Sequence, residues 1–124
     1  MVANEDHSSL PPCPNKPNCV SSQAKDKQHA IDSFPLAKST SSLNLIAEII
    51  QKQPRTRIVE HTDTYLHAEF TSRWFRFIDD VEFLCLPGEE QMHVRSASRV
   101  GYSDLGVNRR RIETLRNLYL EMDK

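Results

Sequence analysis

Glycine, cysteine and tryptophan are scarce in this chain of 124 residues, which has three glycines, three cysteines and one tryptophan. Three cysteines are too few for a scaffold built from several disulfides. No run approaches the roughly 18 apolar residues that cross a bilayer, and no apolar signal-peptide segment follows Met1. We expect either a cytoplasmic protein, or a periplasmic or cell-envelope protein from which a signal or anchor ahead of Met1 was removed. The sequence leaves both open.

An excess of charge of one sign is also missing. The chain has 16 basic and 17 acidic residues, a formal net charge of −1, so no overall field draws it to nucleic acid. The charges are nevertheless unevenly placed, because basic residues become frequent after Arg95 and a run of carboxylates precedes them. We therefore expect an anionic partner only through a local patch, and no specific binding of nucleic acid.

The first 28 residues are predicted to form an irregular arm, and residues 29–124 a single folded domain. Four prolines between positions 11 and 17 block regular backbone hydrogen bonding, and neighbouring asparagines and serines favour turns. Cys13 and Cys19 in this arm are interpreted either as unlinked thiols or as a disulfide, which only an oxidising compartment would preserve. Zinc sites need more Cys or His ligands at short spacing, so we predict no metal and no cofactor.

Two helices are predicted. Residues 39–42 offer N-cap hydroxyls, and Leu43, Ile46, Ile49 and Ile50 recur at helical spacing before Pro54 ends the first helix. The second helix begins at about Asn108, with Asp104 or Asn108 as its cap. Its apolar stripe comprises Ile112, Leu115, Leu118, Tyr119 and Met122.

Between the helices the sequence alternates as β-strands do. Extended segments are predicted at 57–61, 65–70, 74–86 (interrupted near Asp79) and 92–99, with a short piece at 31–36. This order of elements implies a single α+β domain. We expect an antiparallel sheet of about four strands, with both helices packed on one face.

The stretch of residues 94–111 is the most unusual, since it holds five arginines together with serines, an aspartate and two glycines. Along its strand, Arg95 and Arg99 share one side and Val94, Ser96 and Ser98 the other. Two registers with the preceding strand are possible. They differ by a slip of one residue, which reverses the side chains that face each other across the strands. We prefer the register in which apolar side chains meet each other and carboxylates meet arginines.

The preferred register places a candidate anion-binding surface on the sheet face without helices. Arg95 and Arg99 would supply guanidinium forks, which Asp80 and Glu82 would orient. The start of the last helix extends this surface, because helix N-termini bind anions. The residues expected there are Ser103, Asp104, Asn108 and Arg109. We therefore expect a non-enzymatic binding module for an anionic small molecule or an acidic partner surface.

Two other interpretations of the same residues stay open. Asp80 or Glu82 could act as general base of a small hydrolase, with Arg95 and Arg99 stabilising an oxyanion. Alternatively, the Arg–Asp motif is purely structural, because Arg–carboxylate ladders across exposed strands are common. No catalytic signature decides between them, and Ser96 has no nucleophile elbow around it. Whether the protein is an enzyme is undecided.

Trp74, Phe75 and Phe77 alternate with Arg73 and Arg76. This pattern is typical of an aromatic and basic stacking surface. We favour packing in the core or at a sheet edge, because strands are predicted on either side. Cys85 is interpreted as a small buried hydrophobe.

Three motifs resemble one known family. They are CPxxPNCVSS at residues 13–22, F-x-DDVEF at 77–83 and RSASRxGxSDxGxNRxRI at 95–112. Together they resemble the domain of unknown function 1499 family (DUF1499) over nearly the whole chain from Cys13, and the last motif is long enough to be specific. The family has no established activity, cofactor or catalytic residue. Its members often carry a signal, lipoprotein or membrane segment before this domain, and some plant members are plastid proteins, which implies an oxidising environment for Cys13 and Cys19.

Overall fold

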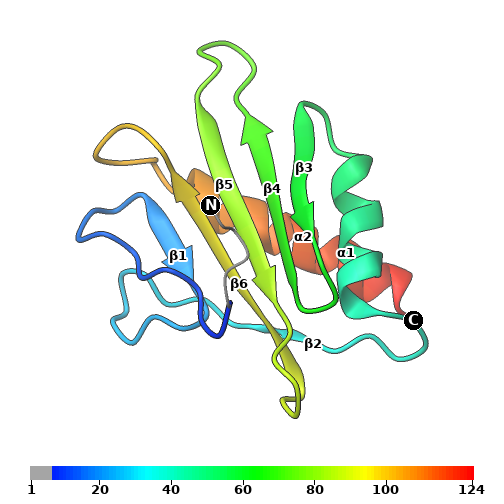
Figure 1. The fold of residues 1–124 in the computed structure, drawn as a ribbon. Coiled ribbons are helices and arrows are strands. Elements are labelled where there is room, and N and C mark those ends of the chain that lie inside the picture. The colour runs from blue at the N-terminus through cyan, green and yellow to red at the C-terminus, as the bar shows by residue number, and fades with distance from the viewer. Residues whose placement is uncertain (1–6) are drawn as a thin grey trace.

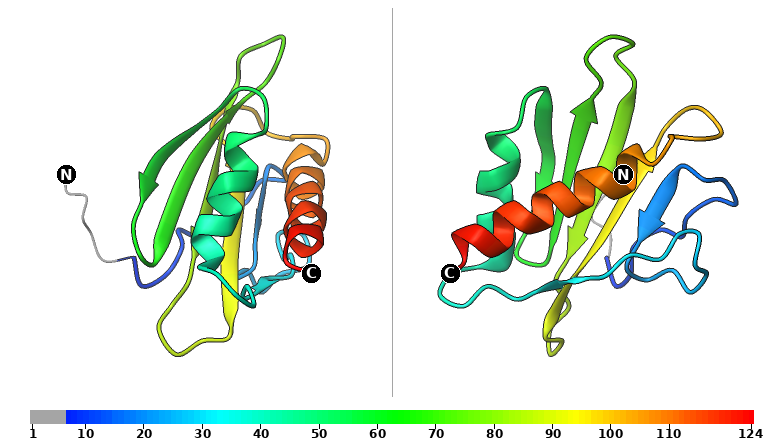
Figure 2. Two further views of the ribbon diagram at one scale, coloured as in Figure 1. Left: turned by 90° about the vertical axis from the view of Figure 1, so that its right-hand side faces the viewer. Right: turned by 180° about the vertical axis from the view of Figure 1, so that it is seen from behind.

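An antiparallel sheet carries two helices on one of its faces in the computed structural model, which describes residues 7–124 (Figures 1 and 2). The elements in chain order are β1 (Cys19–Ser21), β2 (Phe34–Pro35), α1 (Ser42–Gln51), β3 (Thr56–His61), β4 (Tyr65–Thr71), β5 (Ile78–Leu84), β6 (Gln91–Ser98) and α2 (Val107–Met122). The strands lie in the order β1-β6-β5-β4-β3, and β2 also pairs with β6. The predicted α+β domain is confirmed, with six strands where about four were expected.

The β5–β6 register is the one that the charge pattern favoured. Glu82 lies opposite Arg95, and Phe83 lies opposite Val94. The predicted strand at 74–86 is wrong in its first part, because β5 begins only at Ile78 and residues 72–77 form a hairpin loop. Ser72 closes this loop, since its N–H donates to the Phe77 carbonyl at 2.8 Å and its Oγ accepts the Phe77 N–H at 2.9 Å.

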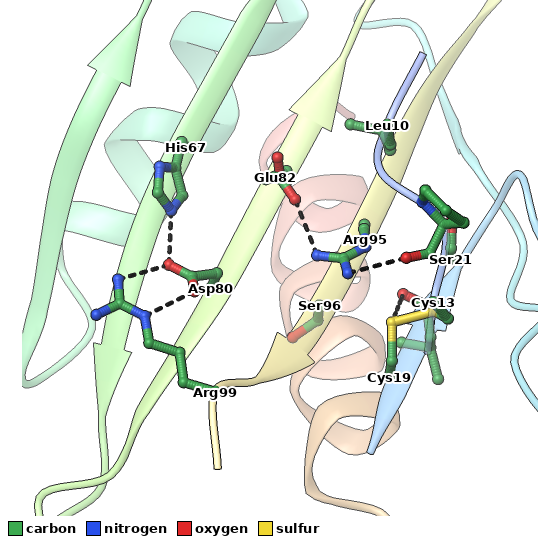
Figure 3. Close-up of polar contacts among 12 residues, drawn as sticks. Leu10, Cys13, Cys19, Ser21, His67, Asp80, Glu82, Arg95, Ser96 and Arg99 are labelled. Carbon is green, nitrogen blue, oxygen red and sulfur yellow. Dashed lines mark hydrogen bonds and ion pairs between the residues drawn. A yellow bond between two sulfur atoms is a disulfide. The ribbon is translucent and has the colours of Figure 1, made fainter. Parts of the chain in front are cut away.

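The described part of the N-terminal arm, residues 7–28, is more ordered than expected, and residues 1–6 of the predicted arm lie outside the described residues. Residues 19–21 form β1 on the free edge of β6, with Cys19 opposite Ala97. Three residues are too few for an alternating pattern to show, so no strand was predicted there. Cys13 and Cys19 are joined as a disulfide (Figure 3). The bond ties the irregular segment at residues 7–18 to the sheet.

The core lies between the sheet and both helices. Ser41 caps α1 by accepting a hydrogen bond from the N–H of Asn44 at 3.3 Å. The helix ends at Gln51 with Lys52 as its C-cap, as the serine run and Pro54 predicted. Of the five apolar residues predicted to face the core from α2, Ile112, Leu115 and Tyr119 are buried, whereas Leu118 and Met122 are not. From the sheet, the largest buried contributors to this core are Phe34, Leu66, Val81, Phe83, Met92 and Val94.

Two smaller expectations also have outcomes. Cys85 is half-buried, not fully buried, and packs at the margin of the core as a free thiol. Within residues 7–124, neither helix is long and apolar enough to cross a membrane.

Candidate functional site

Arg99 follows β6 on the sheet face that carries no helix. Its Nε donates to Oδ2 of Asp80 at 2.8 Å, and its Nη2 donates to Oδ1 of the same carboxylate at 2.9 Å. The same Nη2 reaches Oε2 of Glu69 at 2.6 Å. His67 Nε2 lies 2.7 Å from Asp80 Oδ1 (Figure 3). Arg99 and Asp80 therefore come together as the register predicted, in the two-pronged geometry of strong Arg–carboxylate pairs.

These contacts hold the carboxylates in their charged form. Burial acts to raise the pKa of Asp80, but hydrogen bonds from Arg99 and His67 outweigh it and keep this pKa below its ordinary value. The hydrogen bond from Arg99 likewise lowers the pKa of Glu69. A carboxylate with a lowered pKa is a weak proton acceptor, so Asp80 is poorly suited to general-base chemistry.

Arg95 forms a separate cluster beneath the N-terminal arm. Its Nη1 donates to Oε1 of Glu82 at 3.1 Å, and its Nη2 donates to the Pro12 carbonyl at 3.2 Å (Figure 3). Glu82 is 7% exposed and also accepts a hydrogen bond from the Tyr65 hydroxyl. Burial and the contact with Glu82 raise the pKa of Tyr65. Leu10 packs on Tyr65, so the arm covers this part of the sheet face that was expected to be open.

Asn108, in the first turn of α2, is fully buried against β6. Its Oδ1 accepts a hydrogen bond from the Ser96 hydroxyl at 2.6 Å, and its Nδ2 donates one to Ser98 Oγ at 2.9 Å. The Nδ2 also donates to Asp104 Oδ2 at 2.7 Å. The two serines of β6 therefore face the helix layer and hydrogen-bond to it, as the alternation of the strand predicted.

Asp104 places a carboxylate at the N-terminus of α2. Its Oδ1 accepts the Gly106 N–H at 2.8 Å, and its Oδ2 accepts the Asn108 N–H at 3.1 Å. Burial acts to raise the pKa of Asp104, but the hydrogen bonds from Asn108 and Gly106 lower it overall. The helix terminus that was expected to bind an external anion thus already holds one from its own chain.

Arginines of α2 contact the segment at residues 28–33. Arg109 donates through Nη1 to the Ala30 carbonyl at 2.9 Å and through Nη2 to the Gln28 carbonyl at 3.2 Å. Seven residues later, Arg116 reaches two further carbonyls of this segment at 2.7 and 2.8 Å. The two guanidiniums fix the chain that enters β2 against the helix.

The residues predicted as one site therefore occupy three places. Arg99 and Asp80 lie on the free sheet face, Arg95 and Glu82 lie under the arm, and Ser103, Asp104, Asn108 and Arg109 lie where β6 turns into α2. In the last group, Ser103, Asp104 and Arg109 line a cavity of about 190 Å³ beside Cys19. Among residues 7–124, no three His, Cys, Asp or Glu side chains are grouped so as to hold a metal ion.

The family comparison covers nearly all of this architecture. A family model described as Protein of unknown function (DUF1499) matches residues 9–118, which include six strands, α1 and most of α2. The chain belongs to the DUF1499 family. Comparisons with curated proteins and with solved structures gave no match. The long motif that suggested DUF1499 contains the residues of the buried Asn108 network, so much of that motif holds α2 on the sheet.

Three exposed aromatic side chains of this DUF1499 domain lie on the β4–β5 loop, and two of them are the most exposed aromatics among residues 7–124. Trp74, Phe75 and Phe77 are 77%, 76% and 52% exposed. The prediction that they pack in the core or at a sheet edge is wrong, because they are exposed and lie in the loop before β5 begins at Ile78. One signal was present in the sequence. Trp74 and Phe75 are neighbours, and a strand would send two such neighbours to opposite faces.

The arginines of the DUF1499 domain fall into two sets. Those paired with carboxylates are Arg57, Arg95, Arg99, Arg111 and Arg116. Within the described part of the chain, no carboxylate lies within ion-pairing distance of the other five, which are Arg55, Arg73, Arg76, Arg109 and Arg110. Arg109 donates instead to the backbone carbonyls of residues 28 and 30. The density of arginines in the sequence did not separate these sets, because pairing depends on neighbours that only the fold supplies.

Four of these five arginines belong to the loops, or to the first helical turn, at one end of the sheet; these loops lie at the top of Figure 1. Arg55 lies in the α1–β3 turn, Arg73 and Arg76 in the β4–β5 loop, and Arg110 donates to the Leu105 carbonyl of the β6–α2 loop at 3.0 Å. We call this region the basic end and define it as residues 52–55, 72–77 and 99–107 with Arg110. The turns at the opposite end of the strands carry Asp63, Glu89 and Glu90.

Proposed function

We propose that this domain is a non-enzymatic binding module that recognises anionic partners through its basic end. The observation that carries the proposal is the set of four arginines there with no carboxylate partner among residues 7–124. A guanidinium that no carboxylate neutralises can attract an external anion by its positive charge and bind it through its N–H groups. The basic end also carries Lys52 and Arg99, and Asp104 is its one carboxylate.

The arginines at the centre of the sequence-based hypothesis have a different place in this proposal. Arg95 and Arg99 donate to Glu82, Asp80 and Glu69, so an anion at either would have to displace a carboxylate of the chain. We assign these pairs, together with Asp104, to holding the sheet, the arm and α2 in register. Anion binding at Arg95 or Arg99 stays an untested prediction.

The hydrolase alternative draws less support. It needs a carboxylate that accepts a proton near neutral pH, whereas Arg99 and His67 keep the pKa of Asp80 low. Glu82 lies buried between Arg95 and Tyr65, which already occupy its oxygens. A substrate oxygen would have to replace one of those two donors.

The disulfide bears on where such a module would act. A Cys13–Cys19 bond persists in oxidising compartments and is reduced in most cytosols. It supports a periplasmic, envelope or other oxidising location as part of this proposal.

Retention on immobilised heparin tests the proposed function. Heparin is a soluble polyanion, and contacts to it weaken with salt in proportion to the cationic groups involved. We expect the Arg73→Ala, Arg76→Ala variant to elute at lower salt than the wild type. The matched control is Lys25→Ala, Lys27→Ala, which removes the same charge from the exposed loop after β1. Equal loss of retention in both variants, or none in either, would contradict a binding surface at the basic end.

A further inference from the structure

The basic end is also the most apolar exposed region of the described chain. Its two long loops present six large apolar side chains with more than half of their surface exposed. They are Trp74, Phe75, Phe77, Val100, Tyr102 and Leu105. Phe77 and Val100, from different loops, line one cavity of about 430 Å³ together with Val107, and Asp79 and Asp104 also line it. The two loops therefore meet at this cavity. We call the six exposed side chains the patch, and such a group exceeds the single exposed apolar residues that ordinary surfaces carry.

The loops that carry this patch have defined shapes. Within residues 7–124, the non-glycine residues with positive φ are Arg55, Arg76 and Leu105, at 57°, 59° and 55°, and all three belong to the basic end. This conformation is unfavourable for long side chains and persists where the surroundings impose it. Arg110 holds the Leu105 carbonyl, and the Ser72–Phe77 pair closes the hairpin loop. The loops thus present Leu105 and the aromatic rings outward on a fixed frame.

Cationic and apolar groups are interleaved within the patch. The Arg73 guanidinium lies 4.9 Å from the centre of the Trp74 ring, and the Phe75 and Phe77 rings stack at 5.6 Å. No carboxylate among the described residues neutralises Arg73 or Arg76. A partner for this surface must therefore accept rings and aliphatic chains while offering negative charge beside them.

We infer that the basic end docks on a bilayer that contains anionic phospholipids. This inference rests on the proposed function and names the partner of the same surface. Trp and Phe favour the boundary between acyl chains and headgroups, and arginines beside them attract anionic headgroups. The two loops project from one end of the strands, so both can meet a flat surface at once (Figures 1 and 2). The carboxylates Asp63, Glu89 and Glu90 lie at the far end, away from the negative membrane.

Single-stranded nucleic acid is the other polyanion that combines with aromatic and basic side chains. Its bases stack on rings, and aliphatic side chains such as Val100 and Leu105 contribute nothing to stacking. A lipid interface takes up rings and aliphatic chains alike, and a protruding hairpin inserts more readily than it cradles a strand. The mixed composition of the patch therefore favours lipid.

Fluorescence of Trp74 provides a direct test, since it is the only tryptophan in the chain. The probes are vesicles of phosphatidylcholine alone and vesicles with 30% phosphatidylglycerol, each with and without brominated acyl chains. We expect a shift to shorter wavelength and quenching by bromine only with the anionic vesicles. Arg73→Ala, Arg76→Ala should weaken partitioning by roughly fivefold per arginine. Phe75→Ser, Leu105→Ser should weaken it at least tenfold, and Lys25→Ala, Lys27→Ala should leave it unchanged.

The outcomes separate the two proposals. Retention on heparin with no Trp74 shift on anionic vesicles overturns the membrane inference and leaves the proposed function standing. Binding of an oligothymidylate with Trp74 quenching, but no response to vesicles, assigns the surface to nucleic acid and also overturns the inference. Failure with heparin, oligonucleotide and vesicles overturns both. Circular dichroism and thermal melting of each variant confirm that it is folded, and Arg73→Lys, Arg76→Lys should keep the vesicle response because it keeps the charge.

Discussion

The Asp104 carboxylate accepts two hydrogen bonds from Asn108, one from its backbone N–H and one from its side-chain amide. Asn108 in turn bonds Ser96 and Ser98 of β6. A loop residue, the first turn of α2 and the last strand are thereby joined in one buried polar network. Such networks stabilise a fold only when every member is satisfied, so removal of one member leaves the others unpaired.

Replacement of Asp104 by alanine should therefore be costly. We expect the free energy of unfolding to fall by about 2 kcal/mol, since Asn108 loses a charged acceptor and α2 loses its N-terminal carboxylate. Urea denaturation followed by circular dichroism measures the loss. Asp63→Ala, in the exposed β3–β4 turn, is the control and should change stability little. Equal midpoints for the two variants would mean that the network is dispensable.

Arg95 should act as a structural residue. In Arg95→Met, the buried Glu82 loses its cationic partner, and we expect a loss of about 3 kcal/mol. The double variant Arg95→Met, Glu82→Gln removes both charges and should recover much of that loss. A double-mutant cycle by chemical denaturation gives the coupling. If Arg95→Met unfolds at the wild-type midpoint, the pair contributes no stability and the structural role is wrong.

Stability should decline in acid. The folded-state pKa values of Asp80, Glu69 and Asp104 are all lowered, so the folded chain binds fewer protons than the unfolded chain where ordinary carboxyls titrate, near pH 4. Their stabilisation is full above about pH 5 and is lost as the pH falls through the lower folded-state values. Denaturation midpoints at pH 7, 5 and 3 measure this dependence. Arg99→Ala should flatten it, because Arg99 lowers two of the three pKa values, and an unchanged slope would contradict that origin.

The disulfide should stabilise the arm. Closing so short a loop restricts the unfolded chain by an amount worth about 2 kcal/mol, and the bond secures the residues that cover Arg95. Dithiothreitol should lower the melting temperature of the wild type. It should have no effect on Cys13→Ser, Cys19→Ser, which should already melt at the lower temperature. A wild-type melt insensitive to reductant would show that the bond is not formed or not stabilising.

Much of the fold was predictable because its determinants are local or pairwise. The serine run and Pro54 bound α1, and period-two alternation with opposite charges set Glu82 beside Arg95. The start of β5 was missed because the loop at 72–77 contains no Gly, Pro or Asn to mark a turn. Arg109 was assigned to a ligand because its partners are backbone carbonyls of residues 28 and 30, which no sequence pattern reveals.

The candidate site was predicted less well for a related reason. The sequence locates arginines and carboxylates, but only the fold decides which of them neutralise each other. Arg95 and Arg99 lie beside carboxylates across the sheet, whereas Arg73 and Arg76 extend from a hairpin loop beyond the strands, where no carboxylate of the described residues lies within ion-pairing distance. The surface that we propose for a partner is therefore one for which the sequence predicted packing.

The location of the binding surface is the central claim, and amide chemical-shift mapping with a heparin hexasaccharide tests it most directly. Spectra of the ¹⁵N-labelled chain report every non-proline backbone amide during the titration. We predict that the largest shifts lie at residues 72–77 and 99–107, with little change at Asp80, Glu82 and Arg95. Largest shifts at those three residues, with the two loops unaffected, would contradict the account.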